Sequence, residues 1–164
     1  MDGTENGGLR ERKKLATREA LSAAALRLAR ERGPDNVRVD EIAAAAGVSP
    51  RTYNNYFSSR EQAIVAAISA ERALRIGAAL RARPAEEPLA TAVVEAVVEQ
   101  YTAEQEPGSE AFVLLTSTPG LRAEFLATVA AIEDPLAGAI AERAGLADEL
   151  TASVLAAAVS AAAR

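Results

Sequence analysis

The 164-residue sequence contains neither cysteine nor histidine. The lack of cysteine excludes disulfides and thiolate metal sites and fits the reducing cytoplasm. The lack of histidine removes the commonest general base and the commonest metal ligand of proteins. We therefore expect no metal and no other cofactor, and any enzyme chemistry would have to rest on carboxylates, lysine or tyrosine. No pair of such groups has the spacing of a catalytic motif.

Aromatic residues are also scarce, at 4% of the sequence. The core must therefore consist mainly of Ala, Leu, Val and Ile, which suits close-packed helices and predicts an all-α fold. No apolar run approaches the roughly 18 residues that a membrane span needs. The N-terminus also has no apolar region of the kind found in signal peptides. These features predict a cytoplasmic protein.

The net charge of −5 is unevenly distributed along the chain. Residues 1–60 contain 11 Lys/Arg and 8 Asp/Glu, a balance of +3. Residues 61–164 contain 7 and 15, a balance of −8. Such an asymmetry indicates that the two parts have different tasks, and the basic part is the candidate for contact with an anionic partner.

Residues 1–60 are expected to form a mobile polar arm, residues 1–8, followed by three helices. The amphipathic first helix spans about residues 9–32 and ends at Gly33-Pro34. The second spans about 39–46 and the third about 50–57. Ser58 and Glu61 have capping-box spacing before a long fourth helix at about 59–83.

The remaining chain, residues 59–164, is expected to form a helical body. Helices are predicted at about 89–104, 110–117 and 120–144, the last interrupted by Pro135 and preceded by Thr118-Pro119, a cap with proline at its first position. The chain ends inside an alanine-rich helix without a stop signal, which suggests truncation at the C-terminus.

The stretch "IAAAAGVSPRTYNNYF", residues 42–57, has the layout of a helix-turn-helix. Alanines allow the first helix to pack closely, and Gly47 takes the backbone conformation that ends it. Ser49 supplies an N-cap and Pro50 an N1 residue for the second helix. Helix-turn-helix proteins place this second helix in the major groove of DNA.

The second helix carries side chains suited to reading DNA. Arginine hydrogen-bonds guanine, asparagine hydrogen-bonds adenine, and hydroxyl groups suit phosphates. Its capped N-terminus adds the positive end of a helix dipole. The segment with these properties is Ser49, Pro50, Arg51, Thr52, Tyr53, Asn54 and Asn55. Phe57 is expected to be buried, with Tyr56 at the edge of the core.

The segment "VDEIAAAAGVSPRTYNNYFSSREQAI", preceded by "REALSAAALRLARERG", resembles the DNA-binding domain of the TetR family of bacterial transcriptional regulators. The resemblance covers roughly residues 10–70. It implies an N-terminal three-helix head at 9–58, with the helix-turn-helix at about 39–57, and an effector-binding and dimerisation body at 59–164. It also implies a homodimer that binds a palindromic DNA operator, usually as a repressor, and leaves it when a small molecule binds the body.

The resemblance assigns DNA contacts to ten residues. Ser49, Pro50, Arg51, Thr52, Tyr53, Asn55 and Tyr56 fall on the recognition helix, and Arg60 replaces the usual lysine near the phosphate backbone. Lys13 and Lys14 lie where the first helix would pass a phosphate strand, and Lys14 is the candidate of the two. Arg38 stands where the family commonly has a threonine cap, so the second helix needs another cap and Arg38 is free to bind phosphate.

The helical body gives weaker signals. A largely apolar effector is expected, because apolar walls with a few hydroxyl or amide groups are typical of ligand pockets. The candidates for its pocket are Gln100, Tyr101, Phe112, Thr116 and Phe125, and Thr118 offers a further hydroxyl. The candidates for a dimer interface lie in the last helix: Leu150, Val154, Leu155 and Val159.

Two other functions are compatible with the sequence. The chain could be a helical protein-interaction module whose helix-turn-helix does not bind DNA, and a neutral or acidic surface around Arg51 would favour that function. Less favoured is a helical enzyme that relies on carboxylates.

Overall fold

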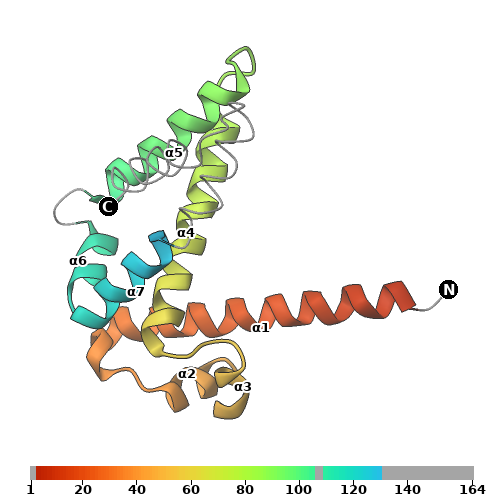
Figure 1. Ribbon diagram of the computed structural model, residues 1–164, viewed down its shortest axis with the longest axis vertical. Helices are drawn as coiled ribbons and strands as arrows, with labels where there is room; N and C mark the ends of the chain where they lie inside the picture. The colour runs from red at the N-terminus through yellow and green to blue at the C-terminus, as the bar shows by residue number, and fades with distance from the viewer. Residues whose placement is uncertain (1–2, 106–108, 131–164) are drawn as a thin grey trace, which may run out of the picture. The chain divides into compact units, whose positions relative to one another are not determined.

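The computed structural model describes residues 3–105 and 109–130. These residues form seven α-helices and one short 3-10 helix and contain no β-strand, which confirms the all-α prediction for them. The chain divides into two compact units, residues 1–100 and 101–164. Each unit is described by itself below, and Figure 1 gives the helix labels.

Helix α1 (Gly3–Arg32) begins six residues before the predicted start. Residues 3–8, assigned by the sequence to a mobile arm, are helical. Glycine disfavours a helix by only about 1 kcal/mol per residue, and no proline stops the helix from extending toward the N-terminus. Every side chain from Leu9 to Ala16 is exposed. This half of α1 projects past α2 and α3 (Figure 1).

The C-terminus of α1 is formed as predicted. Gly33 follows it with a φ of 79°, and its N–H donates to the carbonyl of Ala29 over 2.9 Å. Pro34 then opens the 3-10 helix η1 (Pro34–Asn36). The positive φ explains why a glycine occupies this position, because side chains other than hydrogen rarely tolerate it.

A small apolar core holds the head together. Helix α1 packs against α4 (Arg60–Ala82) and α2 (Val39–Ala45), and α2 packs against α3 (Pro50–Asn54). Burying each large apolar side chain contributes about 1.5–3 kcal/mol. The largest fully buried side chains of this unit are Tyr53, Phe57, Leu21, Leu26, Ile42, Ile64, Val37 and Val65.

Helix α4 starts with a cap one residue later than predicted. The hydroxyl of Ser59, not Ser58, accepts the N–H of Gln62 over 3.0 Å. The Gln62 side chain in turn accepts the N–H of Ser58 over 2.8 Å. A two-pronged ion pair between Arg30 and Glu71, at 3.0 Å for each prong, joins α4 to α1. The first unit, residues 1–100, contains α4, which the sequence had assigned to the body.

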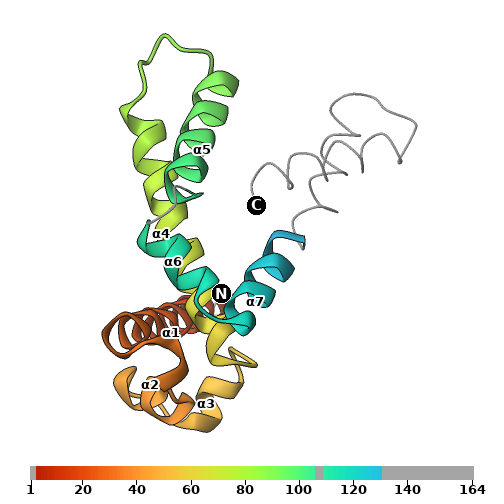
Figure 2. The same cartoon turned by 90° about the vertical axis from the view of Figure 1, so that its left-hand side faces the viewer.

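Three further helices follow: α5 (Leu89–Gln105), α6 (Glu110–Thr116) and α7 (Pro119–Ala130). Figure 2 shows α6 and α7 joined by a short turn. Thr118 caps α7 by accepting the N–H of Leu121 over 3.2 Å, as predicted from Thr118-Pro119. Pro135 and the final alanine-rich helix lie outside the described residues. No helix in the described ranges is long and apolar enough to cross a membrane.

Candidate nucleic-acid interface

The turn between α2 and α3 is a Schellman motif built around Gly47. The N–H of Val48 donates to the carbonyl of Ala43 over 2.9 Å, and the N–H of Gly47 donates to the carbonyl of Ala44 over 3.1 Å. Gly47 has a φ of 70°, as this motif requires. The motif satisfies carbonyls that the end of α2 would otherwise leave unpaired, so it fixes the direction in which the chain leaves α2.

Helix α3 begins as the sequence predicts. The hydroxyl of Ser49 accepts the N–H of Thr52 over 3.1 Å and lies 2.9 Å from the Thr52 hydroxyl. Pro50 occupies the first helical position, where the missing N–H costs nothing. The helix is shorter than the predicted 50–57, since Asn55 and Tyr56 form a turn. A firmly capped first turn therefore presents the residues that follow Ser49.

The short helix α3 has a buried face and an exposed face. Tyr53 and Phe57 point into the core, with their ring centroids 5.8 Å apart. Arg51, Asn54 and Asn55 are exposed on the other side. The guanidinium of Arg51 makes no hydrogen bond or ion pair within the part of the chain that the structure describes. This arrangement leaves one arginine and two amides available to an external partner.

Asn54 belongs to the segment predicted to read DNA, although the resemblance assigns it no contact, and it lies three residues after Arg51. Positions i and i+3 share a helix face, so Asn54 and Arg51 lie on the same exposed side of α3. Ser49 and Pro50 are exposed as predicted, and Thr52 and Tyr56 are half-buried.

The prediction that the Tyr53 side chain faces DNA is wrong, because Tyr53 has no exposed surface. Its hydroxyl donates a hydrogen bond of 2.7 Å to the carbonyl of Ser59. Burial, with a smaller contribution from the carboxylate of Glu61, raises the pKa of Tyr53 to about 12. Tyr53 thus supports the recognition helix from behind and stays neutral at physiological pH.

Arg60 is also engaged within the protein instead of being free for phosphate. Its Nη1 donates to the carbonyls of Asp35 and Val37, both over 3.1 Å. Its Nε donates to the Glu61 carboxylate over 2.8 Å. These bonds tie the segment before α2 to the start of α4, and they use most of the directions in which a guanidinium can donate.

Arg38 stands where the family commonly has a threonine cap, and Glu41 caps α2 in its place. The Glu41 carboxylate accepts the Arg38 N–H over 3.1 Å and also pairs with Arg32 over 3.0 Å. The Arg38 side chain is exposed and donates to Asp40 over 3.1 Å. That hydrogen bond, more than the charge of Arg38, holds the pKa of Asp40 below its usual value. Arg38 is therefore placed at the surface, where an exposed ion pair holds it weakly.

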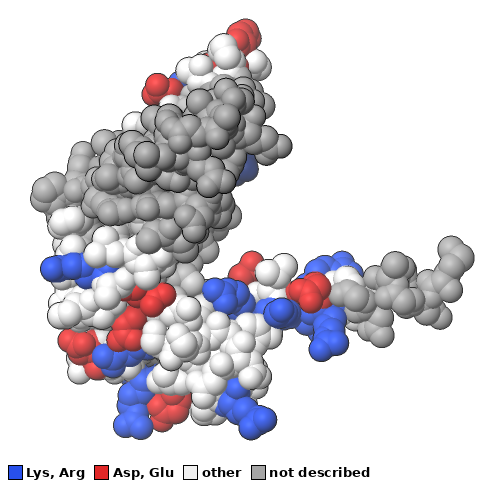
Figure 3. Space-filling model, viewed as in Figure 1, with Lys and Arg blue, Asp and Glu red and all other residues white. Residues whose placement is uncertain are grey.

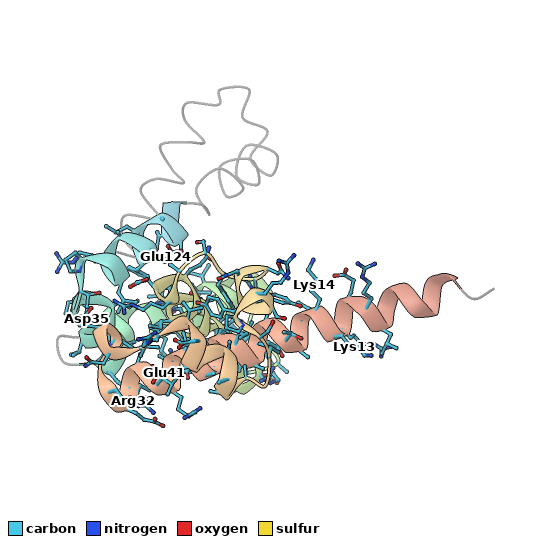
Figure 4. The ribbon with its side chains drawn as sticks, turned by 90° about the horizontal axis from the view of Figure 1, so that it is seen from below. Lys13, Lys14, Arg32, Asp35, Glu41 and Glu124 are labelled. Atoms are coloured by element: carbon cyan, nitrogen blue, oxygen red, sulfur yellow. The ribbon has the colours of Figure 1, made fainter. Side chains whose placement is uncertain are left out.

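Basic side chains also line the projecting half of α1. Between Leu9 and Arg18 the helix contains five basic residues and one acidic residue, Glu11. Figure 3 shows their blue side chains along this helix. Figure 4 shows Lys13 and Lys14 on opposite sides of it. Arg18 lies nearer the core: it donates to the carbonyl of Tyr56 over 3.0 Å and lies 4.5 Å above the Phe57 ring.

Comparisons with known proteins agree with this geometry. Residues 21–67 match the model of bacterial regulatory proteins of the tetR family, and residues 83–164 match the model of the MftR C-terminal domain. The HTH-type transcriptional regulator TcmR of Streptomyces glaucescens is 37% identical over 153 residues, which cover 87% of this chain and 67% of TcmR. The chain belongs to the TetR family.

A second relative matches a shorter stretch of this TetR-family protein. The HTH-type transcriptional regulator BetI of Rhizobium meliloti (strain 1021) is 47% identical over 51 residues, 31% of this chain and 25% of BetI. Together the family and its named relatives identify a helix-turn-helix transcriptional regulator and not an enzyme.

The candidate effector residues of this TetR-family regulator lie in both units. Gln100 is half-buried in the first unit, whereas Phe112, Thr116 and Phe125 belong to the second. The hydroxyl of Thr116 donates to the carbonyl of Phe112 over 2.7 Å, and Thr118 caps α7, so both hydroxyls are used within their own helices. The structure does not describe the side chain of Tyr101. The candidate dimer residues Leu150, Val154, Leu155 and Val159 lie outside the described residues.

Proposed function

We propose that this TetR-family regulator is a repressor that binds a palindromic operator as a homodimer and is released from it by a small, largely apolar effector. The exposed face of α3 carries the proposal. Arg51, Asn54 and Asn55 lie together there, in a helix whose start is fixed by the Gly47 turn and whose back is held by Tyr53.

In this proposal Arg51 and the two asparagines read bases in the major groove. An arginine can donate two hydrogen bonds to guanine and an asparagine can pair with adenine, each contact contributing about 1–3 kcal/mol of discrimination. Four further residues lie beside the phosphates: Ser49, Pro50 and Thr52 at the start of α3, and Tyr56. Arg38 and Lys14 are exposed cations that contact the phosphate backbone.

Effector binding and dimerisation are assigned to the helical body. We propose that the effector contacts Gln100, Tyr101, Phe112, Thr116 and Phe125, and that Leu150, Val154, Leu155 and Val159 contribute to the dimer. The support is the family membership together with the apolar character of these segments.

The proposal is tested by selecting binding sites from genomic DNA with the full chain and titrating the selected site with salt. We expect a palindromic site whose affinity falls steeply as salt rises, because each neutralised phosphate releases counterions. Arg51→Ala should reduce affinity roughly 5- to 150-fold, the equivalent of about 1–3 kcal/mol.

Arg27→Ala is the matched control. Arg27 is an exposed arginine that pairs with Glu31 on α1, so its removal takes away the same charge from α1 instead of α3. Equal effects of the two substitutions, or no selected site at all, would show that α3 does not read DNA. Expression of a reporter placed behind the site then distinguishes repression from activation.

A further inference from the structure

The projecting half of α1 packs against no other element in the described part of its unit. Its side chains from Leu9 to Ala16 are all exposed. The segment from residue 3 to residue 17 extends about 22 Å at about 1.5 Å per residue. It also precedes residues 21–67, which match the family model.

The sequence of α1 changes character along one face of the helix. Residues seven apart on an α-helix point within about 20° of each other, so Lys14 shares a face with Leu21 and Leu28. Leu21 and Leu28 are buried in the core of the head, at 0% and 4% exposure. The face that is apolar where α1 packs is therefore cationic where α1 projects.

Three cations on this face form what we call the cationic row: Arg10, Lys14 and Arg18. They follow one another at i, i+4 spacing, which places them on one side of the helix. Like charges at this spacing repel each other. Neither Arg10 nor Lys14 forms a hydrogen bond or ion pair through its side chain within the described residues. A row of like charges without ion-pair partners favours an anionic partner.

Arg18 fixes where the row begins. Its contacts with the Tyr56 carbonyl and the Phe57 ring place it against the turn that follows α3. The row therefore starts beside the recognition helix and continues outward along α1. Arg12 lies off the row and donates back to the carbonyl of Gly8 over 3.2 Å. Lys13 is turned about 100° from Lys14 around the helix axis. It lies on the other side of α1 in the view of Figure 4.

We infer that Arg10 and Lys14 bind the phosphate backbone of DNA beside the bases read by α3, so that the projecting helix lengthens the footprint of each head. This inference rests on the proposed DNA binding of α3 and adds a phosphate-binding residue, Arg10, together with a defined face of α1. Arg10 and Lys14 add affinity without sequence preference, because phosphates carry no base identity.

The test compares two double variants of the full chain that each remove two positive charges: Arg10→Gln with Lys14→Gln on the row, and Arg12→Gln with Lys13→Gln off it. Glutamine has nearly the same helix propensity as lysine and arginine, so α1 should stay helical, and circular dichroism checks this. The DNA is the selected operator with flanking duplex on both sides.

We expect the row variant to lower the slope of log affinity against log salt by about 0.9 for each phosphate that is no longer neutralised. For two phosphates, a rise in salt from 50 to 200 mM should therefore weaken DNA binding by the row variant about tenfold less than binding by the unchanged chain. The off-row variant should change the slope by much less. Ethylation interference with the unchanged chain should mark phosphates outside the bases that α3 reads, and these marks should disappear in the row variant.

Equal decreases in slope for the two variants would overturn the inference, because they would indicate general attraction by charge instead of a defined row. An unchanged slope in the row variant would overturn it while leaving base reading by α3 intact. Absence of specific binding by the unchanged chain would overturn both proposals. Tighter binding of the chain to phosphatidylglycerol vesicles than to operator DNA would assign the row to a membrane surface and overturn the inference too.

Discussion

The hydroxyl of Tyr53 donates a hydrogen bond of 2.7 Å to the backbone carbonyl of Ser59, the residue that caps α4. This bond joins the recognition helix α3 directly to the start of the long helix α4. Tyr53 is the only buried residue among the five of α3. The orientation of such a short helix therefore depends largely on one side chain, which makes Tyr53 a structural residue within the DNA-binding head.

Replacing Tyr53 should reduce stability, in contrast to replacing the exposed Arg51. Tyr53→Phe removes one hydrogen bond and should lower the free energy of unfolding by about 0.5–1.5 kcal/mol. Tyr53→Ala also removes the ring and should cost about 3–5 kcal/mol. Arg51→Ala should stay within about 0.5 kcal/mol. Denaturant unfolding measures all three. A Tyr53→Phe chain of unchanged stability that no longer binds DNA would place the hydroxyl on the DNA.

The raised pKa of Tyr53 predicts an alkaline loss of stability. The phenol ionises near 10.0 in the unfolded chain and at about 12 in the folded protein. Between these values the unfolded chain releases the proton while the folded protein keeps it, so stability falls as pH rises through this range. The stability advantage of the unchanged chain over Tyr53→Phe should be constant below about pH 10, shrink above it and reverse before about pH 12, because a pKa difference of about 2 amounts to about 2.7 kcal/mol. A constant difference up to that pH would contradict burial of the phenol.

Two glycine-to-alanine substitutions should have opposite effects on stability. Gly47 has a φ of 70°, and a Cβ placed there would meet no atom within 4 Å. Gly47→Ala should therefore cost about 1–2 kcal/mol through backbone strain and not through a clash. Gly8 lies inside α1 with equally open surroundings. Gly8→Ala should add up to about 1 kcal/mol of helix stability, because alanine is the better helix former.

Denaturant unfolding measures the stability of the two variants, and circular dichroism measures their helix content. The same chemical change is made twice, so the sign depends only on backbone conformation. A Gly47→Ala chain as stable as the unchanged protein would mean that the turn tolerates a different backbone and that the Schellman motif is not needed.

The elements of the head could be predicted because their signals are local. Gly33 and Gly47 end helices through their own φ values, and Ser49 caps α3 through a hydrogen bond only three residues away. Each of these helix ends and caps depends on neighbouring residues and does not depend on how the helices pack. The same holds for Thr118, which caps α7 as its position before proline predicts.

Sequence patterns say less about residues whose role depends on partners distant in sequence. Arg60 bonds to carbonyls 23 and 25 residues away, a pairing that no local pattern reveals. Tyr53 was misplaced because its helix was read as a uniform DNA-facing segment, although its i, i+4 spacing with Phe57 indicates a shared buried face. The sequence predicts an arm instead of an extension of α1 to Gly3 because residues 1–8 contain three glycines, although the cost of each is small for an established helix.

Arg60 provides a direct test of whether positive charge or a specific hydrogen-bonding geometry matters at the start of α4. Lysine keeps the charge of arginine but lacks its planar fork of donors. If Arg60 ties the segment before α2 to α4, both Arg60→Lys and Arg60→Gln should lower the free energy of unfolding by about 1–3 kcal/mol. The salt dependence of DNA binding should then stay unchanged in both. If Arg60 instead binds phosphate, Arg60→Lys should bind DNA normally, while Arg60→Gln should lower the salt slope by about 0.9. Measuring unfolding and salt slope on the same two variants separates these roles, because each predicts an effect in one measurement and none in the other.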